Sequence, residues 1–171
     1  IEDNTYSKGW NAIAAKMAKP RAILSVSAHW QTSGTFVTAM PHPKTIHDFY
    51  GFPQELFDVN YNAPGSPELA AKTQEVVKTT TVGLDLDRWG LDHGTWSVLR
   101  KMYPNADIPV FQLSMDFRKS PAEHFAIGEE LRALRDEGVL ILGSGHLVHT
   151  LGMMRSDGKN YEWAEEFDAQ A

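Results

Sequence analysis

Residues 21–30, RAILSVSAHW, decide the fold class of this chain. The apolar run 22–26 is short, follows Pro20 and precedes a polar turn that contains Gly34. This pattern is typical of a strand that is buried on both faces, inside a sheet covered by helices. The strand runs into His29, so we expect an imidazole at the carboxyl edge of the sheet, where open α/β sheets bind their ligands.

A second stretch repeats this arrangement. The apolar run 139–142, VLIL, is followed by a Gly-Ser-Gly segment and then by His146 and His149. His93 lies in a glycine-containing turn just before a predicted helix, where the backbone can approach a ligand closely and the helix amino end favours a neutral imidazole. We therefore expect His29, His93 and His149 to converge on one site at one edge of the sheet.

Predicted strands and helices alternate along nearly the whole chain, which indicates an α/β fold with a mainly parallel central sheet flanked by helices. We expect a single domain over residues 1–171. Periodicity and capping signals predict helices over 4–19, 66–77, 96–103, 120–138 and 161–167, and strands over 21–29, 35–40, 108–114 and 139–142. The threonine-rich run 79–82 is a candidate further strand. The first helix is expected to pack on the sheet through Tyr6, Trp10, Ile13, Ala14 and Met17.

Residues 44–64 form a long predicted loop that is rich in aromatic side chains, and such a loop is a candidate pocket wall. His47 lies in this loop and either lines a pocket or covers the core. Taken singly, the other histidines have structural explanations. His42 stands between two prolines and His124 in the first turn of a helix, so both are expected at the surface.

The composition excludes several classes of partner. Sixteen Lys and Arg stand against 22 Asp and Glu, for a net charge of −6, and no basic run predicts nucleic-acid binding. No apolar run approaches the roughly 20 residues of a membrane-spanning helix, and the amino terminus lacks a signal-peptide pattern. We therefore expect a protein of the cytoplasm that binds neither nucleic acid nor membrane.

The chain has no cysteine, so a metal would be held by His, Asp or Glu. Neutral imidazoles suit iron(II) or zinc, and two of them plus one further group leave positions open for a substrate. Zinc would act on a bound water, whereas iron(II) could bind an organic substrate together with dioxygen. The residue pattern alone leaves both metals open.

Six segments of the chain are distinctive when taken together and in order. They are SAHW (27–30), TIHDFYGFP (45–53), YNAPGSPELA (61–70), WGLDHGTW (89–96), KMYPNADIPVFQLS (101–114) and SGHLVHTL (144–151). In this order they resemble the class III (LigB-like) extradiol ring-cleavage dioxygenases of the DOPA 4,5-dioxygenase type. The resemblance implies a LigB-like fold and a non-haem metal enzyme that opens the aromatic ring of a catechol such as DOPA with dioxygen. Iron(II) is the metal expected from the resemblance, and zinc is able to occupy the same site.

The resemblance also implies roles for individual residues. His29 matches a metal-binding histidine, and His149 matches a histidine that is either a metal ligand or the acid/base beside the metal. His93 matches a histidine near substrate and oxygen, so His93 and His149 are the expected catalytic residues. At position 146 many relatives carry asparagine, and a histidine there could reach the metal, bind substrate or replace the asparagine as a donor. The expected substrate-binding residues are His47, Asp92 and His146.

The chain departs from the family pattern at both ends. The family's first metal histidine lies in a G-H-G-S-P turn upstream of the first helix, and a further histidine lies beyond the position that corresponds to Ala171. Neither is present in the sequence, so we expect the chain to be the central portion of a longer enzyme. Two alternatives remain open, a zinc-dependent hydrolase on the same scaffold and a non-enzymatic relative that binds aromatic compounds.

Overall fold

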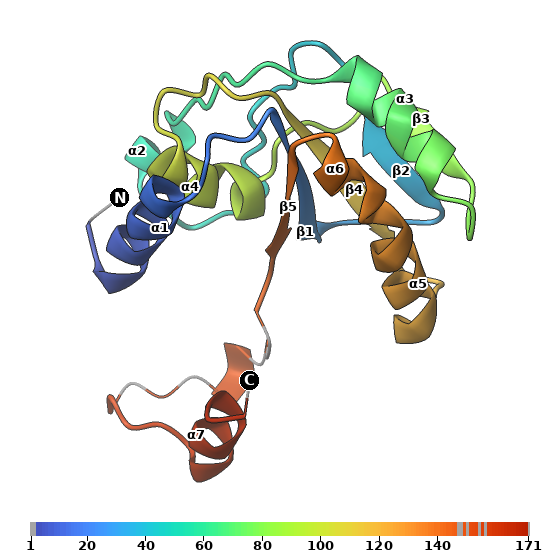
Figure 1. The fold of residues 1–171 in the computed structure, drawn as a ribbon. Coiled ribbons are helices and arrows are strands. Elements are labelled where there is room, and N and C mark those ends of the chain that lie inside the picture. Colours follow the sequence, from blue (N-terminus) through green and yellow to red (C-terminus); the bar gives the residue numbers. More distant parts are fainter. Residues whose placement is uncertain (1–2, 147–148, 150, 154, 156, 171) are drawn as a thin grey trace.

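The structure is a computed structural model that describes residues 3–146, 149, 151–153, 155 and 157–170. Within these residues, five strands form one sheet with helices on both faces (Figure 1). The order across the sheet is β3-β2-β4-β1-β5. The strands are β1 (Ala22–Thr32), β2 (Thr35–Thr38), β3 (Val82–Asp85), β4 (Val110–Asp116) and β5 (Val139–Ser144).

The sheet is mainly parallel, which confirms the predicted fold class. β1 pairs in parallel with β4 and β5, and β2 pairs in parallel with β3. The exception is the antiparallel contact between β2 and β4, at Val37 and Leu113. β2 runs opposite to β1 because the two are joined by a tight turn at Gly34, whose φ of 111° is accessible mainly to glycine.

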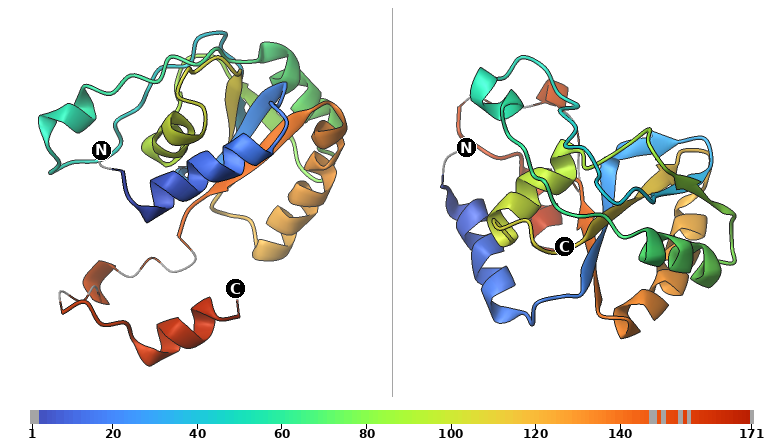
Figure 2. Two further views of the ribbon diagram at one scale, coloured as in Figure 1. Left: turned by 60° about the vertical axis from the view of Figure 1, so that its left-hand side comes forward. Right: turned by 90° about the horizontal axis from the view of Figure 1, so that it is seen from above.

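Two layers of helices cover the sheet (Figure 2). α1 (Thr5–Lys16) and α4 (His93–Met102) lie on one face, while α3 (Pro67–Val76), α5 (Pro121–Leu131) and α6 (Ala133–Asp136) lie on the other. Successive residues of β1 alternate between the two cores, because Ala22 and Leu24 pack with the α3/α5/α6 layer and Ile23 packs with the α1/α4 layer. The remaining helices are α2 (Gln54–Phe57), the 3₁₀ turn η1 (Leu151–Met153) and α7 (Glu162–Asp168).

The first helix differs from its expected packing. α1 begins after Asn4, which caps it as expected, and it packs mainly against α4, while its Ala14 also belongs to the core cluster that contains Ile23 of β1. Tyr6 is 75% exposed and Ile13 is 53% exposed, whereas Ser7 and Ala14 are buried. The prediction was wrong for Tyr6 and Ile13, and the main partner of the helix is α4, because the apolar periodicity marks an inward face without saying whether a sheet or a helix covers it.

Several element ends also differ from expectation. β1 does not end at His29 but continues to Thr32, with a shift in its pairing to β4 between Val26 and Gln31. The run 79–81 is not a strand, since β3 begins at Val82. The predicted helix 120–138 is divided into α5 and α6 at Arg132.

In the part of the chain that the structure describes, no helix is both long and apolar enough to cross a membrane.

Candidate functional site

Two of the three predicted histidines meet, and an aspartate stands between them. The ring centroids of His29 and His93 are 4.0 Å apart. Asp48 Oδ2 lies 3.2 Å from His29 Nδ1, and Asp48 Oδ1 accepts hydrogen bonds from both the backbone N–H and the Nδ1 of His93, each at 2.9 Å. One ligand atom from each residue lies within 4.8 Å of the others, so this group could hold a metal ion.

The three side chains come from three different elements. His29 lies in the irregular part of β1, His93 is the first residue of α4, and Asp48 lies in the loop after β2. The loop is held beside the start of α4 by a parallel bridge between Thr45 and Leu91. Backbone hydrogen bonds from Ile46 to Leu91 and from Leu91 to Lys44 complete this contact, at 2.7 and 2.8 Å.

Gly94 allows α4 to start close to β1. A Cβ atom at this position would lie 2.5 Å from Ser27 Oγ and 3.0 Å from His29 Cδ2, both too close for an unrelaxed packing. Two further contacts tie the helix start to the sheet, a 2.7 Å hydrogen bond between Ser25 and Thr95 and a 2.6 Å hydrogen bond from Ser144 to the Gly94 carbonyl. His93 is therefore held against His29 by the packing of its own helix.

The electrostatics of the site favour a charged pair. The hydrogen bond to Asp48 raises the pKa of His93 above its ordinary value of 6.5, although burial opposes this. Burial alone would raise the pKa of Asp48, but the hydrogen bonds from the side chain and backbone of His93 outweigh it and lower that pKa below 3.8. The carboxylate of Asp48 thus acts against the neutral form of His93 that the helix amino end was expected to favour.

A cavity of about 330 Å³ adjoins His93. Its wall combines aromatic side chains from α1, from the loop after β2 and from α4 with two cationic side chains near the carboxyl end of α4. Such a cavity is large enough for a single aromatic ring with a short side chain. The aromatic residues are Trp10, Phe49, Phe52 and Trp96, and the cations are Arg100 and Lys101.

The two other expected substrate residues near this region have structural partners. Asp92 is fully buried and caps α4 by accepting a hydrogen bond from the Thr95 N–H at 3.1 Å, while Gln112 Nε2 donates to its other oxygen at 2.8 Å. This burial argues against direct contact with a substrate and indicates a role in holding the start of α4. His47 Nε2 lies 2.9 Å from the Val59 carbonyl oxygen, and its ring packs near Trp96.

His146 and His149 follow β5, where the chain leaves the sheet (Figure 1). Both residues are exposed, and their rings stack with centroids 5.6 Å apart. The group of potential metal ligands found among the described residues contains neither of them. The roles assigned to His146 and His149 therefore stay predictions.

Sequence reasoning missed Asp48. It lies within the HDF segment of the aromatic loop, next to His47, so the available signal was a carboxylate beside a histidine in a loop expected to wall a pocket. That signal is weak, because a loop without periodicity does not indicate which of its side chains points inward.

The fold and the site together define an α/β domain with a candidate metal site of nitrogen and oxygen ligands beside an aromatic cavity. Residues 3–171 match the family described as the catalytic LigB subunit of aromatic ring-opening dioxygenase, and the chain belongs to this family.

The chain is also similar to individual relatives. It is 51% identical over 170 residues to a protein of Escherichia coli K12 named 4,5-DOPA dioxygenase extradiol, an alignment that covers 98% of this chain and 63% of that relative. A protein of the same name from Beta vulgaris is 46% identical over 156 residues, covering 88% of this chain and 58% of that relative. The chain thus spans less than two thirds of the length of these relatives.

A solved structure shows the same fold. The crystal structure of an uncharacterized protein from Escherichia coli K12 superposes with a TM-score of 0.83 at 44% sequence identity. The superposition covers 99% of this chain and 65% of that structure. This likeness confirms the predicted LigB-like arrangement of strands and helices.

Proposed function

We propose that the protein is an extradiol dioxygenase that opens the aromatic ring of a catechol such as DOPA with dioxygen. The observation that carries the proposal is the family match over residues 3–171, together with relatives named 4,5-DOPA dioxygenase extradiol. In this reaction one ring carbon–carbon bond adjacent to the hydroxyl pair breaks. Both atoms of dioxygen enter the product, which gains a carboxyl group and an aldehyde.

The donor set supports a non-haem metal. Two imidazole nitrogens and one carboxylate oxygen from His29, Asp48 and His93 are the ligand types that iron(II) and zinc accept, and the family resemblance adds His149 as a further candidate. Iron(II) is the metal we propose. Catechol and dioxygen do not react directly with each other. When bound, iron(II) supplies a path for electrons from the catechol to dioxygen.

The residues of the chain account for binding and proton transfer. Trp10, Phe49 and Trp96 form an aromatic wall against which a catechol ring can pack while water is excluded. His93 Nδ1 is engaged by Asp48, so its Nε2 is the ring nitrogen left either to bind the metal or to hydrogen-bond the reactants. His149 is the proposed base for a phenolic proton, which rests on its place in the SGHLVHTL segment.

The test is oxygen uptake by the protein after anaerobic loading with iron(II) and addition of DOPA. We expect one dioxygen consumed for each catechol opened, and a loss of turnover of more than about 100-fold in His29→Ala, because a metal ligand is removed. His42→Ala is the matched control, since His42 is exposed in a loop away from the group. Unchanged turnover in His29→Ala would contradict the proposal, and product formed without oxygen would favour a zinc-dependent hydrolase.

A further inference from the structure

An arginine side chain lines the cavity beside His93. Arg100 of α4 lines the cavity, and its guanidinium Nη1 is buried and has no hydrogen-bond acceptor within the described residues. Lys101, the neighbouring cation, is already paired, with 2.6 Å between its Nζ and Asp3 Oδ1. Nη1 itself has almost no accessible surface, so an anionic group in the cavity would meet the rest of the Arg100 side chain, for which the described residues provide no carboxylate partner.

Arg100 is the cation of the described lining that has no carboxylate beside it. Lys101 is paired with Asp3, the lining itself contains no carboxylate, and the rest of the wall is aromatic, apolar or uncharged. The ligand that complements such a cavity has an aromatic ring at one end and an anionic group at the other.

The helix sets the distance between the two ends of the cavity. His93, Ser97 and Arg100 follow one face of α4 at i, i+4 and i+7. The seven-residue separation places His93 and Arg100 about 10 Å apart along the helix axis, at about 1.5 Å per residue. Side chains on a helix lean toward its amino end, which is the direction of His93 from Arg100.

We propose that Arg100 is a specificity-determining residue, which binds the carboxylate of the substrate and so favours catechols that carry an acidic side chain over neutral ones. This inference rests on the proposed function, which places the catechol end at His93. The planar guanidinium fits a carboxylate through two parallel hydrogen bonds, and this geometry distinguishes it from lysine. Among the described lining residues none is an acid, so the proposal assigns no partner to the amino group of DOPA.

The test measures binding without turnover, by calorimetry on the iron(II)-loaded protein under anaerobic conditions. Four catechols separate the contributions: DOPA, 3,4-dihydroxyphenylpropionate without the amine, dopamine without the carboxylate, and 4-methylcatechol without either. Arg100→Met should weaken binding of the two carboxylates by about 10- to 100-fold, the loss expected for a charge-assisted hydrogen bond. It should leave dopamine and 4-methylcatechol within about twofold of the wild type.

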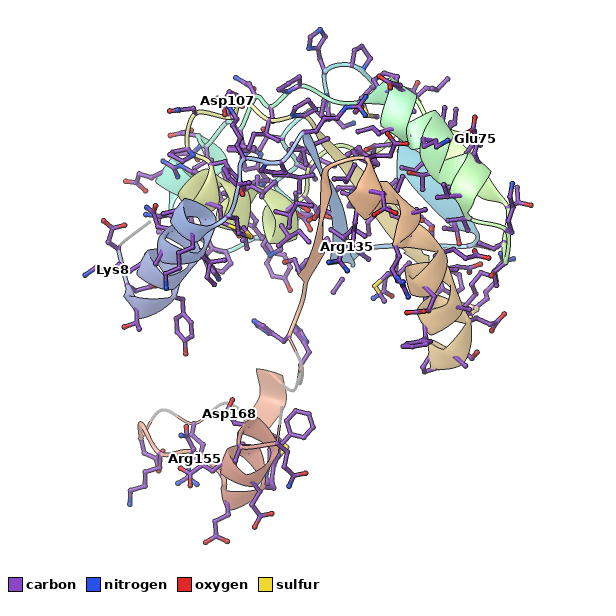
Figure 3. The ribbon with its side chains drawn as sticks, in the orientation of Figure 1. Lys8, Glu75, Asp107, Arg135, Arg155 and Asp168 are labelled. Atoms are coloured by element: carbon purple, nitrogen blue, oxygen red, sulfur yellow. The ribbon has the colours of Figure 1, made fainter. Side chains whose placement is uncertain are left out.

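Two further variants keep the result interpretable. Arg135→Met removes an exposed arginine of α6, on the opposite face of the sheet (Figure 3), and should change the binding of none of the four ligands. Arg100→Lys retains the charge but loses the planar fork, so it should weaken only the two carboxylates, by less than Arg100→Met. It also tests the proposal if Arg100→Met proves unfolded in a thermal melt.

Equal weakening of all four ligands by Arg100→Met, or wild-type binding that does not distinguish carboxylates from neutral catechols, would overturn the proposal. Failure of the proposed function gives a different result. If no catechol is opened in the presence of oxygen but carboxylates still bind in a manner that depends on Arg100, the ring-opening activity is wrong and the anion site stands. If 4-methylcatechol is opened and Arg100→Met has no selective effect on the carboxylates, the ring-opening activity stands and the anion site is wrong.

Discussion

The carboxylate of Asp48 determines which nitrogen of His93 is available for chemistry. An ionised carboxylate only accepts hydrogen bonds, so in the neutral ring the proton lies on Nδ1, where Asp48 is 2.9 Å away. The Nε2 atom of His93 then keeps its lone pair and can act as ligand, base or acceptor. Asp48 is thus a positioning residue for His93 in the metal-free protein.

At this residue scale, Asp48→Asn should lower the pKa of His93, because the acceptor that raises it above 6.5 loses its charge. The measurement is an NMR titration of the His93 ring in metal-free protein, which also reports the nitrogen that carries the proton. Asp58→Asn is the matched control, because Asp58 is an exposed carboxylate in the same loop, hydrogen-bonded to Gln54. A His93 pKa that stays the same in Asp48→Asn would show that Asp48 is not the cause of the shift.

The same pair makes stability depend on pH. The raised pKa of His93 means that its contribution is fully present below 6.5 and is lost as pH rises through the higher value in the folded state. The lowered pKa of Asp48 means that its contribution is present above 3.8 and is lost as pH falls through the lower folded value. The difference in unfolding free energy between wild type and Asp48→Asn should therefore be largest between pH 3.8 and pH 6.5. This difference should be less than about 1 kcal/mol, because both groups are partly exposed.

At the scale of elements, the close approach of α4 to β1 depends on the absence of a side chain at Gly94. Gly94→Ala would place a methyl group 2.5 Å from Ser27 Oγ, so the helix start must shift away from the strand. We expect a loss of about 1–3 kcal/mol in unfolding free energy from overpacking. Urea denaturation measures this loss.

Gly128→Ala provides the control for this prediction. Gly128 lies inside α5, and a Cβ there would meet no atom within 4 Å. The same substitution should stabilise the protein by about 0.5–1 kcal/mol, because alanine favours a helix more than glycine does. If Gly94→Ala is also stabilising, the contact between α4 and β1 is looser than the structure indicates.

Elements with strong local signals could be predicted from the sequence, and those whose position depends on distant contacts could not. Ser120 caps α5 through a capping box with Glu123, a purely local signal, and the start of α5 is where the pattern places it. Asp48 reaches the site only because the bridge between Thr45 and Leu91 holds its loop against α4, and no local pattern marks such a contact. The meeting of His29 and His93 was predictable because His29 lies at the end of a strand signal and His93 lies just before a helix signal.

At the scale of the whole molecule, the order of strands is the part that the sequence did not reveal. β1 and β2 are consecutive and joined by a tight turn, yet β4 lies between them in the sheet. β4 can take this central place because nearly all of its residues are buried, from Val110 to Ser114 without interruption. Its uninterrupted apolar and small polar character is typical of a strand covered on both faces, but it does not say which strands will be its neighbours.

This unequal burial predicts how local stability is distributed, and hydrogen exchange measures it. The amides of β4 should open only with global unfolding, on the order of 5–15 kcal/mol, since the strand is paired on both sides and covered on both faces. α7 has no buried residue and is only seven residues long, so its opening free energy should be near zero. α5 is the matched helix, with Ile127 and Leu131 buried against the sheet, and its protection should lie between the two. Protection of α7 equal to that of α5 would contradict this distribution, because a helix of that length needs a packed face to be stable in water.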